Sequence, residues 1–181
     1  MISHMPNGFF LALSMILLFL ILGILLSGLI NMLIPLFKTP KKDMPGLLDA
    51  LDIQDKDVFF DLGSGDARVI FEVRKRNKKA KLYGYEISPI LLLIGQLKKS
   101  LLFPMDKNLI LEAENLFDVD YSKATKIYCY LSPEALEILR EKFERVGKKF
   151  KVYSYKYRIP DMRAKKKFEL ESGEVLYLYE F

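Results

Sequence analysis

The chain has no charged side chain before Lys38, so all 28 basic and 23 acidic residues, and the whole net charge of +5, lie in Lys38–Phe181. In the uncharged part, Phe9 to Ile30 form an apolar stretch broken only by serines and glycines. A helix of these 22 residues is roughly 33 Å long, enough for a bilayer core of about 30 Å. The sequence therefore predicts an N-terminal segment, 1–37, with a transmembrane helix at about 9–30.

Two other interpretations of the apolar stretch have less support. A cleaved signal peptide requires a basic start, a shorter apolar region and a small-residue cleavage site. A core helix of this length is too long for so small a domain. The lysines at Lys38, Lys41 and Lys42 favour placing the rest of the chain in the cytoplasm, or on the matrix side of an organelle. We therefore expect a single-pass protein of the cell membrane, with the membrane itself as a partner.

The charged part alternates between strand and helix patterns. Residues 38–45 contain two prolines and predict a linker, followed by a folded domain, 46–181. Strands are expected at Asp57–Leu62, Lys81–Glu86, Asn108–Ala113, Thr125–Leu131 and Lys149–Tyr157, and helices at Asp66–Asn77, Pro89–Leu101 and Pro133–Gly147. This order predicts an α/β fold with a mostly parallel sheet covered on both faces. The last two strands, around Ser172 and Gly173, predict an antiparallel hairpin.

Several kinds of site are excluded by composition. The single cysteine, Cys129, rules out an internal disulfide and a zinc site built on cysteines. The single histidine, His4, stands just before the apolar stretch and leaves no partner for a Ser–His or Cys–His pair. No metal site is predicted.

The chemistry-bearing residues concentrate in DLGSGDAR, residues Asp61–Arg68. Gly63 and Gly65 stand where a strand turns into a helix, and small residues there let a ligand approach the free N–H groups of the helix. A dinucleotide fingerprint would continue with a third glycine, but Arg68 holds that position. Asp61 would repel a pyrophosphate, so the turn suits a cationic or zwitterionic ligand.

A second acidic residue, Glu86, follows the next strand. A carboxylate at this position can accept hydrogen bonds from both hydroxyls of a ribose. Two acids and a Gly-x-Gly turn on consecutive strand ends indicate a nucleoside ligand. The alternative stays open that Asp61 only caps the helix from Asp66 and that Glu86 only faces solvent.

These motifs resemble a known family. DLGSGDAR followed by YGYE is similar to motif I and the acidic residue after it in class I S-adenosylmethionine-dependent methyltransferases, which have a Rossmann-like fold. TPKK (Thr39–Lys42), ENLF (Glu114–Phe117) and YLSPE (Tyr130–Glu134) resemble a narrower group. That group comprises small membrane-anchored protein-lysine methyltransferases of the ATP synthase c-subunit and adenine nucleotide translocase type, with prokaryotic relatives.

The resemblance implies S-adenosyl-L-methionine as the cofactor. Asp61, Gly63 and Gly65 would hold its amino-acid part, Glu86 its ribose and Asn115 its adenine edge. The full set expected to bind the cofactor is Asp61, Gly63, Ser64, Gly65, Asp66, Glu86, Ile87, Asn115 and Leu116. The chain departs from the family pattern at Ala67, usually glycine, and at Asn115, often aspartate.

The acceptor is expected at the end of the fourth strand. An activated methyl needs mainly a positioned, neutral nucleophile. Tyr130, Ser132 and Glu134 are the candidate catalytic residues there, and Tyr155 is a candidate aromatic wall. Two alternatives remain open: the tyrosines pack within the sheet, and Glu134 stabilises the first turn of its helix.

The predicted function is methyl transfer from S-adenosylmethionine to a protein lysine, on a membrane-associated acceptor. The alternatives are a non-catalytic membrane-tethered nucleoside-binding module and a methyltransferase for RNA or a small molecule. Basic clusters at Lys75–Lys81 and Ala164–Lys167 are compatible with anionic lipid, solvent or an acidic protein, and less with nucleic acid. Oligomeric state is not predicted.

Overall fold

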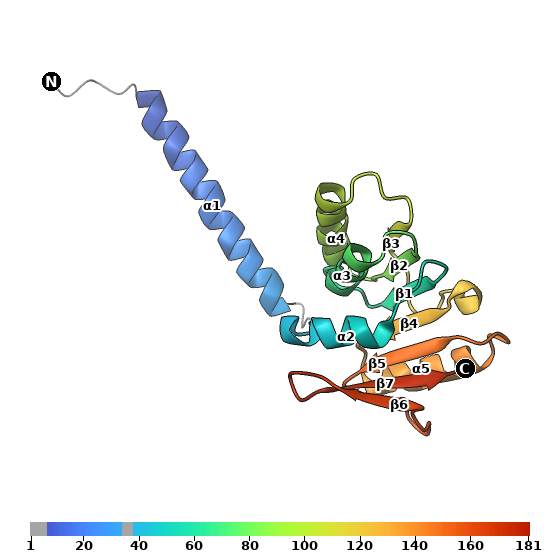
Figure 1. The fold of residues 1–181 in the computed structure, drawn as a ribbon. Coiled ribbons are helices and arrows are strands. Elements are labelled where there is room, and N and C mark those ends of the chain that lie inside the picture. The colour runs from blue at the N-terminus through green and yellow to red at the C-terminus, as the bar shows by residue number, and fades with distance from the viewer. Residues whose placement is uncertain (1–6, 34–37) are drawn as a thin grey trace. The chain divides into compact units, whose positions relative to one another are not determined.

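The computed structural model describes residues 7–33 and 38–181, without the side chains of residues 7, 24 and 26–33. The chain forms two compact units, residues 1–36 and 37–181. Figure 1 shows the elements, which in chain order are α1 (Asn7–Leu33), η1 (Lys41–Asp43), α2 (Met44–Leu51), β1 (Val58–Leu62), α3 (Arg68–Arg76), β2 (Lys81–Tyr85), α4 (Pro89–Leu102), β3 (Leu109–Glu112), η2 (Tyr121–Lys123), β4 (Lys126–Cys129), α5 (Pro133–Glu144), β5 (Lys151–Tyr155), β6 (Lys166–Glu169) and β7 (Val175–Glu180).

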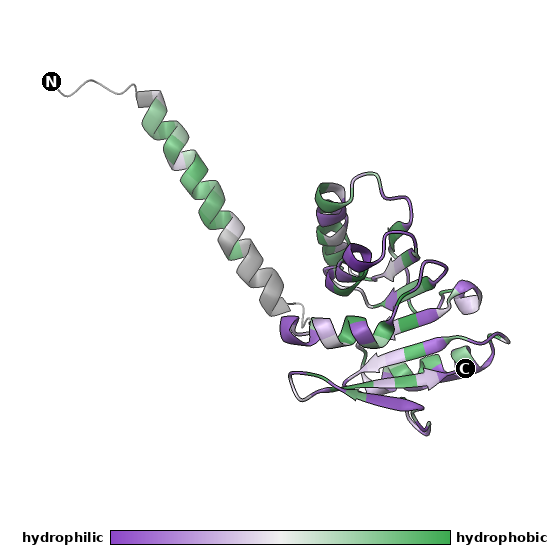
Figure 2. Cartoon of the chain, in the orientation of Figure 1, coloured by the Kyte–Doolittle hydropathy of each residue, from purple (hydrophilic) through white to green (hydrophobic). Residues whose placement is uncertain are grey.

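The first unit contains α1, whose described side chains, at residues 8–23 and 25, are mostly hydrophobic (Figure 2). Across the described residues, the structure has no helix that is both long and apolar enough to cross a membrane. The predicted span at residues 9–30 is therefore unsupported. The predicted single-pass location in the cell membrane is wrong on this finding. Residues 1–6 and 34–37 of the predicted segment 1–37 lie outside the described residues.

The second unit is built on a seven-stranded sheet with the order β3-β2-β1-β4-β5-β7-β6. The first five strands in this order are parallel, whereas β7 runs antiparallel to both β5 and β6. A turn at Ser172 and Gly173 joins β6 to β7, and Gly173 has a φ of +86°, which glycine adopts without strain. The predicted mostly parallel sheet with a C-terminal antiparallel hairpin is confirmed.

Helices cover both faces of this sheet. In β1, Phe59 packs with α2, α3 and α4, while its neighbour Phe60 packs in the core under α5, as the alternation of a strand requires. The central strands are buried on both faces: four of the five residues of β1 and all four of β4 are buried. This burial explains why they read as apolar runs in the sequence.

The helix ends follow ordinary capping chemistry. Proline opens α4 and α5 at Pro89 and Pro133, where its missing N–H is not needed. Ser132 is the N-cap of α5, and its hydroxyl accepts a hydrogen bond from the N–H of Ala135 at 3.4 Å. Basic residues fill the last turn of α3, where they favour the negative end of its dipole.

Candidate active site

The order of the strands reverses at β1: β2 and β3 follow on one side of it, and β4 and β5 on the other. In open parallel sheets, ligands bind outside the carboxyl ends of the strands at such a point. The turn formed by residues 63–67 joins β1 to α3 at that end. The topology therefore puts the glycine-rich turn where a ligand site is expected.

Asp61, in β1, carries a carboxylate that is incompletely satisfied. The residue is only 2% exposed, and its Oδ2 atom has no hydrogen-bond partner among the described residues. Burial raises the pKa of Asp61 to about 8; a hydrogen bond from the backbone of Ile70 opposes this shift, and the charges of Glu86 and Asp66 add to it. The backbone of Ile70 lies in the first turn of α3. The other oxygen lacks a donor, which an ammonium group would supply.

The turn itself is held against the end of β2. The N–H groups of Gly63 and Ser64 both donate to the carbonyl of Tyr85, at 2.9 and 3.0 Å. Gly63 and Gly65 have φ values of +68° and +56°, a region that favours glycine. A side chain at Gly63 would also lie 3.2 Å from Leu131.

Glu86 connects the two strand ends. Its Oε2 atom accepts from the N–H of Gly65 at 2.8 Å, and its Oε1 atom accepts from the N–H of Ser88 at 2.8 Å. The residue is 8% exposed, so it does not simply face solvent. Each carboxylate oxygen has two lone pairs, which leaves capacity for the hydroxyls of a ribose.

Gly84 was not predicted from the sequence as a site residue, yet it lies in β2 directly beside Asp61. A Cβ atom at this position would lie 2.7 Å from Leu111 and 3.0 Å from the hydroxyl of Ser64. Because Gly84 has no side chain, the turn with Ser64 can pack directly against β2. A glycine inside a strand pattern, as in KLYGYE, is the signal that points to such a close approach.

Ala67 also departs from an ordinary conformation. It is the N-cap of α3 with a φ of +62°, and it is 1% exposed. A non-glycine residue in the left-handed region is disfavoured by about 1–2 kcal/mol. Glycine, which the resemblance leads us to expect at this position, would adopt this conformation without strain.

The other predicted cofactor residues have different surroundings. Asp66 pairs with Lys98 of α4 at 3.0 Å, and hydrogen bonding to this lysine holds the pKa of Asp66 low against the effect of burial. Ile87 is 66% exposed just after Glu86. The Oδ1 atom of Asn115 accepts from the N–H of Phe117 at 3.1 Å, and Leu116 packs partly against the core under α5. Asn115 thus shapes the loop after β3.

The three residues predicted as catalytic follow β4 directly. The ring of Tyr130 lies 4.7 Å from that of Tyr155 and 6.2 Å from that of Tyr157, between centroids. Hydrogen bonding to the hydroxyl of Ser132 lowers the pKa of Glu134. Ser132 and Glu134 therefore both contribute to the start of α5.

Residues 38–45, predicted as a linker, supply buried contacts at the same end of the sheet. The hydroxyls of Thr39 and Tyr128 lie 2.7 Å apart. Asp43 is fully buried and accepts hydrogen bonds from the hydroxyls of Tyr155 and Ser172, both at 2.5 Å. Burial opposes ionisation of Asp43, but these donors hold its pKa below the usual range. The sequence carried no signal for these pairings, because their members are up to 129 residues apart.

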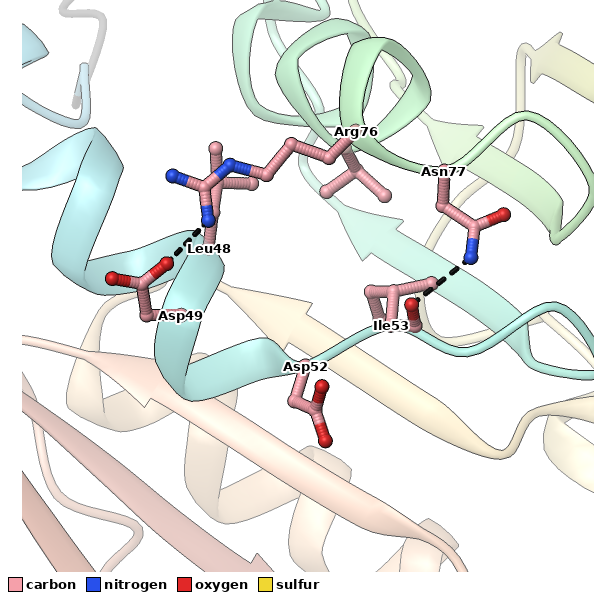
Figure 3. A pocket seen from close by; sticks show the side chains of 7 residues that line it. Leu48, Asp49, Asp52, Ile53, Arg76 and Asn77 are labelled. Atoms are coloured by element: carbon pink, nitrogen blue, oxygen red, sulfur yellow. Dashed lines mark hydrogen bonds and ion pairs between the residues drawn. The ribbon is translucent and has the colours of Figure 1, made fainter.

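A pocket of about 280 Å³ lies between α2 and α3 (Figure 3). Its polar side chains are already engaged, since Arg76 pairs with Asp49 and the amide of Asn77 donates to the carbonyl of Ile53 at 3.0 Å. These contacts join the two helices. This pocket therefore has the character of a structural junction.

The residues around the glycine-rich turn fit S-adenosylmethionine. The unpartnered oxygen of Asp61 suits the ammonium of the amino-acid part, and Glu86 retains acceptor capacity for the ribose. The space above Gly84 keeps the turn close to the sheet. These features match a zwitterionic nucleoside better than a pyrophosphate.

Comparisons with known proteins agree with this chemistry. A sequence model described as the ANTKMT methyltransferase domain matches residues 61–166. A protein-lysine N-methyltransferase of Saccharolobus islandicus is 28% identical over 155 residues, covering 81% of this chain and 92% of the relative.

Solved structures show the same fold. An RNA methyltransferase from Salinibacter ruber, in complex with S-adenosyl-L-homocysteine, has a TM-score of 0.71 and 27% identity, covering 79% of this chain and 92% of that one. An S-adenosylmethionine-dependent O-methyltransferase from Thermotoga maritima, at 13% identity and a TM-score of 0.55, covers 70% of this chain and 48% of that one and shows the fold alone. The chain therefore belongs to the ANTKMT methyltransferase domain family and is an S-adenosylmethionine-dependent methyltransferase.

Proposed function

We propose that this enzyme transfers a methyl group from S-adenosylmethionine to the side-chain amine of a lysine in a protein acceptor. The observation that carries the proposal is the similarity to the protein-lysine N-methyltransferase of Saccharolobus islandicus along 92% of that relative. The family membership makes the chain an enzyme, so the alternative of a non-catalytic binding module is set aside.

The cofactor side of the proposal rests on the turn between β1 and α3. Asp61 takes the ammonium of the cofactor, because its Oδ2 atom is buried without a donor. Glu86 takes the ribose hydroxyls while it holds the turn through Gly65. The remaining proposed contacts are Gly63 and Ser64 in the turn, Asp66 at its end, and Ile87, Asn115 and Leu116 on the adenine side.

The acceptor side of the proposal rests on the aromatic residues after β4 and in β5. Tyr130, which is only partly buried, offers a ring face beside the carboxyl end of β4, and the buried ring of Tyr155 packs against it. Aromatic rings accommodate the apolar stem and cationic tip of a lysine. Burial raises the pKa of Tyr130, so its hydroxyl stays protonated near neutral pH. In this proposal Ser132 and Glu134 hold the start of α5, and so position Tyr130.

The reaction needs little further help from the protein. The lone pair of a neutral lysine amine forms the new C–N bond as the S–C bond breaks, S-adenosylhomocysteine leaves, and the amine loses one proton. Lysine has a pKa near 10.4 in water, and removal from solvent favours its neutral form. Holding the amine in line with the methyl group supplies most of the acceleration.

The test is to incubate the full chain with radiolabelled S-adenosylmethionine and protein extract from the source cells, with and without ribonuclease. We expect ribonuclease-resistant label that acid hydrolysis recovers as methylated lysine. Asp61→Asn should abolish it, whereas Asp55→Asn, an exposed aspartate paired only at the surface with Lys79 and Asn77, should not. Label in RNA would contradict the proposal and favour RNA methylation, the activity for which the Salinibacter ruber relative is named.

A further inference from the structure

A groove of about 430 Å³ lies on the face of the sheet opposite α3, at the β3 edge. Its floor includes the rings of Tyr83 and Tyr85, which are stacked with centroids 6.3 Å apart. Its rim carries Glu112, at the end of β3, and Glu114, Asp118 and Asp120 in the following loop. We call this the acidic groove.

The acidic groove exists because no α-helix covers this part of the sheet. Between β3 and β4 the described chain forms only the short helix η2. Val119, in the loop before η2, and Tyr121, the first residue of η2, are buried in the core on this face. The rings of Tyr83 and Tyr85 are left lining a hollow. The fold thus leaves an aromatic surface open beside a row of carboxylates.

The acids of the groove are mostly unneutralised. Within the described residues, no ion pair or side-chain hydrogen bond engages Glu112, Glu114 or Asp118. Asp120 differs, because its carboxylate accepts from the N–H and the hydroxyl of Ser122, both at 2.9 Å. Lys123 is the basic residue in the lining. The groove is therefore negative, whereas the chain as a whole has a net charge of +5.

A second observation points to a ligand. Tyr85 is only 7% exposed and lines the groove, yet no described residue makes a hydrogen bond with its hydroxyl. Glu112 is its direct neighbour across the pair β2 and β3. The hydroxyl is not among the fully enclosed unpaired polar atoms of the described chain, so it reaches the hollow, where a donor that enters the groove can bond to it.

We propose that the acidic groove binds a basic side chain of the protein acceptor, at a position other than the lysine that receives the methyl group. This inference rests on the proposed function. Stacked rings receive the apolar stem of lysine or arginine, carboxylates receive its charge, and the Tyr85 hydroxyl accepts from its N–H donors. An enzyme of positive net charge repels a basic acceptor at long range, so a local negative groove gives it a place to dock.

The groove is close to the methyl-transfer site without being part of it. The carbonyl of Tyr85 holds the N–H groups of Gly63 and Ser64, while its ring lines the opposite face of the sheet. Glu86, the next residue, belongs to the proposed cofactor site. An acceptor that docks in the groove is therefore held at the same end of β2 as the cofactor.

The test measures binding of fluorescein-labelled hexa-arginine to the full chain by fluorescence anisotropy. This probe carries no lysine, so its binding does not depend on methyl transfer. We expect Glu112→Gln combined with Asp118→Asn to weaken binding at least tenfold, and Tyr85→Phe to weaken it about threefold to tenfold. The matched control, Glu169→Gln combined with Glu171→Gln, removes the same charge from exposed positions in and after the opposite edge strand β6 and should change binding less than twofold.

Two further measurements separate the possible outcomes. S-adenosylhomocysteine should bind the groove variant as tightly as wild type, which shows that it is folded. Hexa-arginine should inhibit lysine methylation in wild type and control at least fivefold more strongly than in the groove variant. Equal binding by groove and control variants would overturn the proposal. Hexa-arginine could also bind in a groove-dependent way while the enzyme produces no methylated lysine. That result would support the groove as a site for cations and would contradict the proposed function.

Discussion

The two oxygens of Asp61 differ in their surroundings, and this difference makes cofactor binding depend on pH. Burial raises the pKa of Asp61 to about 8, so near pH 7 most of the free enzyme carries a proton on this carboxyl. A bound ammonium stabilises the ionised form, and binding must then release that proton. Between pH 6 and 7.5 the affinity for S-adenosylhomocysteine should rise by up to about tenfold per pH unit. Calorimetry in buffers of different ionisation enthalpy should detect the proton.

The variant Asp61→Asn tests whether the pH dependence of cofactor binding comes from the Asp61 proton, because asparagine keeps the shape of the side chain but cannot ionise. The asparagine variant should bind S-adenosylhomocysteine at least tenfold more weakly near pH 7.5, with no proton release. An affinity that is independent of pH in the wild-type enzyme would contradict the role given to Asp61.

The same residue predicts an effect on the stability of the free enzyme. The pKa of Asp61 is about 8 in the folded chain, above its usual value of 3.8. Its contribution to stability is therefore complete below about pH 4 and is lost as the pH rises through 8. The asparagine of Asp61→Asn cannot ionise. The melting temperature of the ligand-free variant should therefore exceed that of wild type at pH 8, and by a larger difference than at pH 5. Thermal denaturation at the two pH values measures this, and equal differences would argue against a buried, titrating carboxyl.

Gly84 predicts a steric effect at the same site. In Gly84→Ala the new methyl group would meet Leu111 at 2.7 Å and Ser64 at 3.0 Å, so the turn must move away from β2. Overpacking of this kind destabilises by about 1–3 kcal/mol. Both the denaturation midpoint and the affinity for S-adenosylhomocysteine should fall. Gly23→Ala, which meets no atom within 4 Å, is the control and should change neither.

At the scale of elements, Arg74 joins the amino end of the sheet to α3. It is 1% exposed, pairs with Asp106 at 2.8 Å, and donates to the carbonyls of Asn77, Ala80 and Asn108. Arg74→Met keeps most of the apolar stem but removes the ion pair of Asp106 and one donor from each of three carbonyls, of which that of Asn108 keeps the N–H of Leu82. Breaking a buried pair destabilises by about 3–5 kcal/mol. Urea denaturation should detect this loss, while Arg76→Met, at a more exposed ion pair, should lose under about 1 kcal/mol.

The order of elements was readable from the sequence because each signal is local. Apolar runs ending in Gly63 and Glu86 marked parallel strands, Pro89 and Pro133 marked helix starts, and Gly173 marked the hairpin. The turn with its two acids followed from the same spacing. What could not be read were contacts between distant segments. Thr39 and Asp43 stand among prolines and lysines, and nothing local indicates their bonds to Tyr128 and Tyr155.

The electrostatic differences within the site were equally hidden from the sequence. Asp61 and Asp66 are five residues apart and of one type, yet burial without a full set of donors raises the pKa of the first. Lys98, 32 residues further along, lowers the pKa of the second. The partner that decides each value comes from tertiary structure. Membrane location was inferred from the length of the apolar stretch and from the lysines that follow it, and the described structure does not bear it out.

At the scale of the whole molecule, the enzyme should be contained in the second compact unit. Of the two hydrophobic cores of the described chain, one begins at Met44 and the other in β1, at Phe60. Thr39 and Asp43 add polar contacts with Tyr128 and Tyr155. A fragment of residues 38–181 therefore keeps every contact on which the proposed cofactor site depends. A shorter fragment, 45–181, loses the hydroxyl pair of Thr39 and the buried carboxylate of Asp43.

We predict that residues 38–181 bind S-adenosylhomocysteine as tightly as the full chain. A ligand at 100 times its Kd stabilises a folded protein by about 2.7 kcal/mol, which corresponds to a rise in Tm of roughly 5–10 °C for a domain of this size. Differential scanning fluorimetry should show this rise for the full chain and for 38–181. Fragment 45–181 should melt lower without ligand, because Tyr128, Tyr155 and Ser172 lose their partners, and should gain less from the ligand. A fragment 38–181 that binds more weakly than the full chain would show that the first unit contributes to the site.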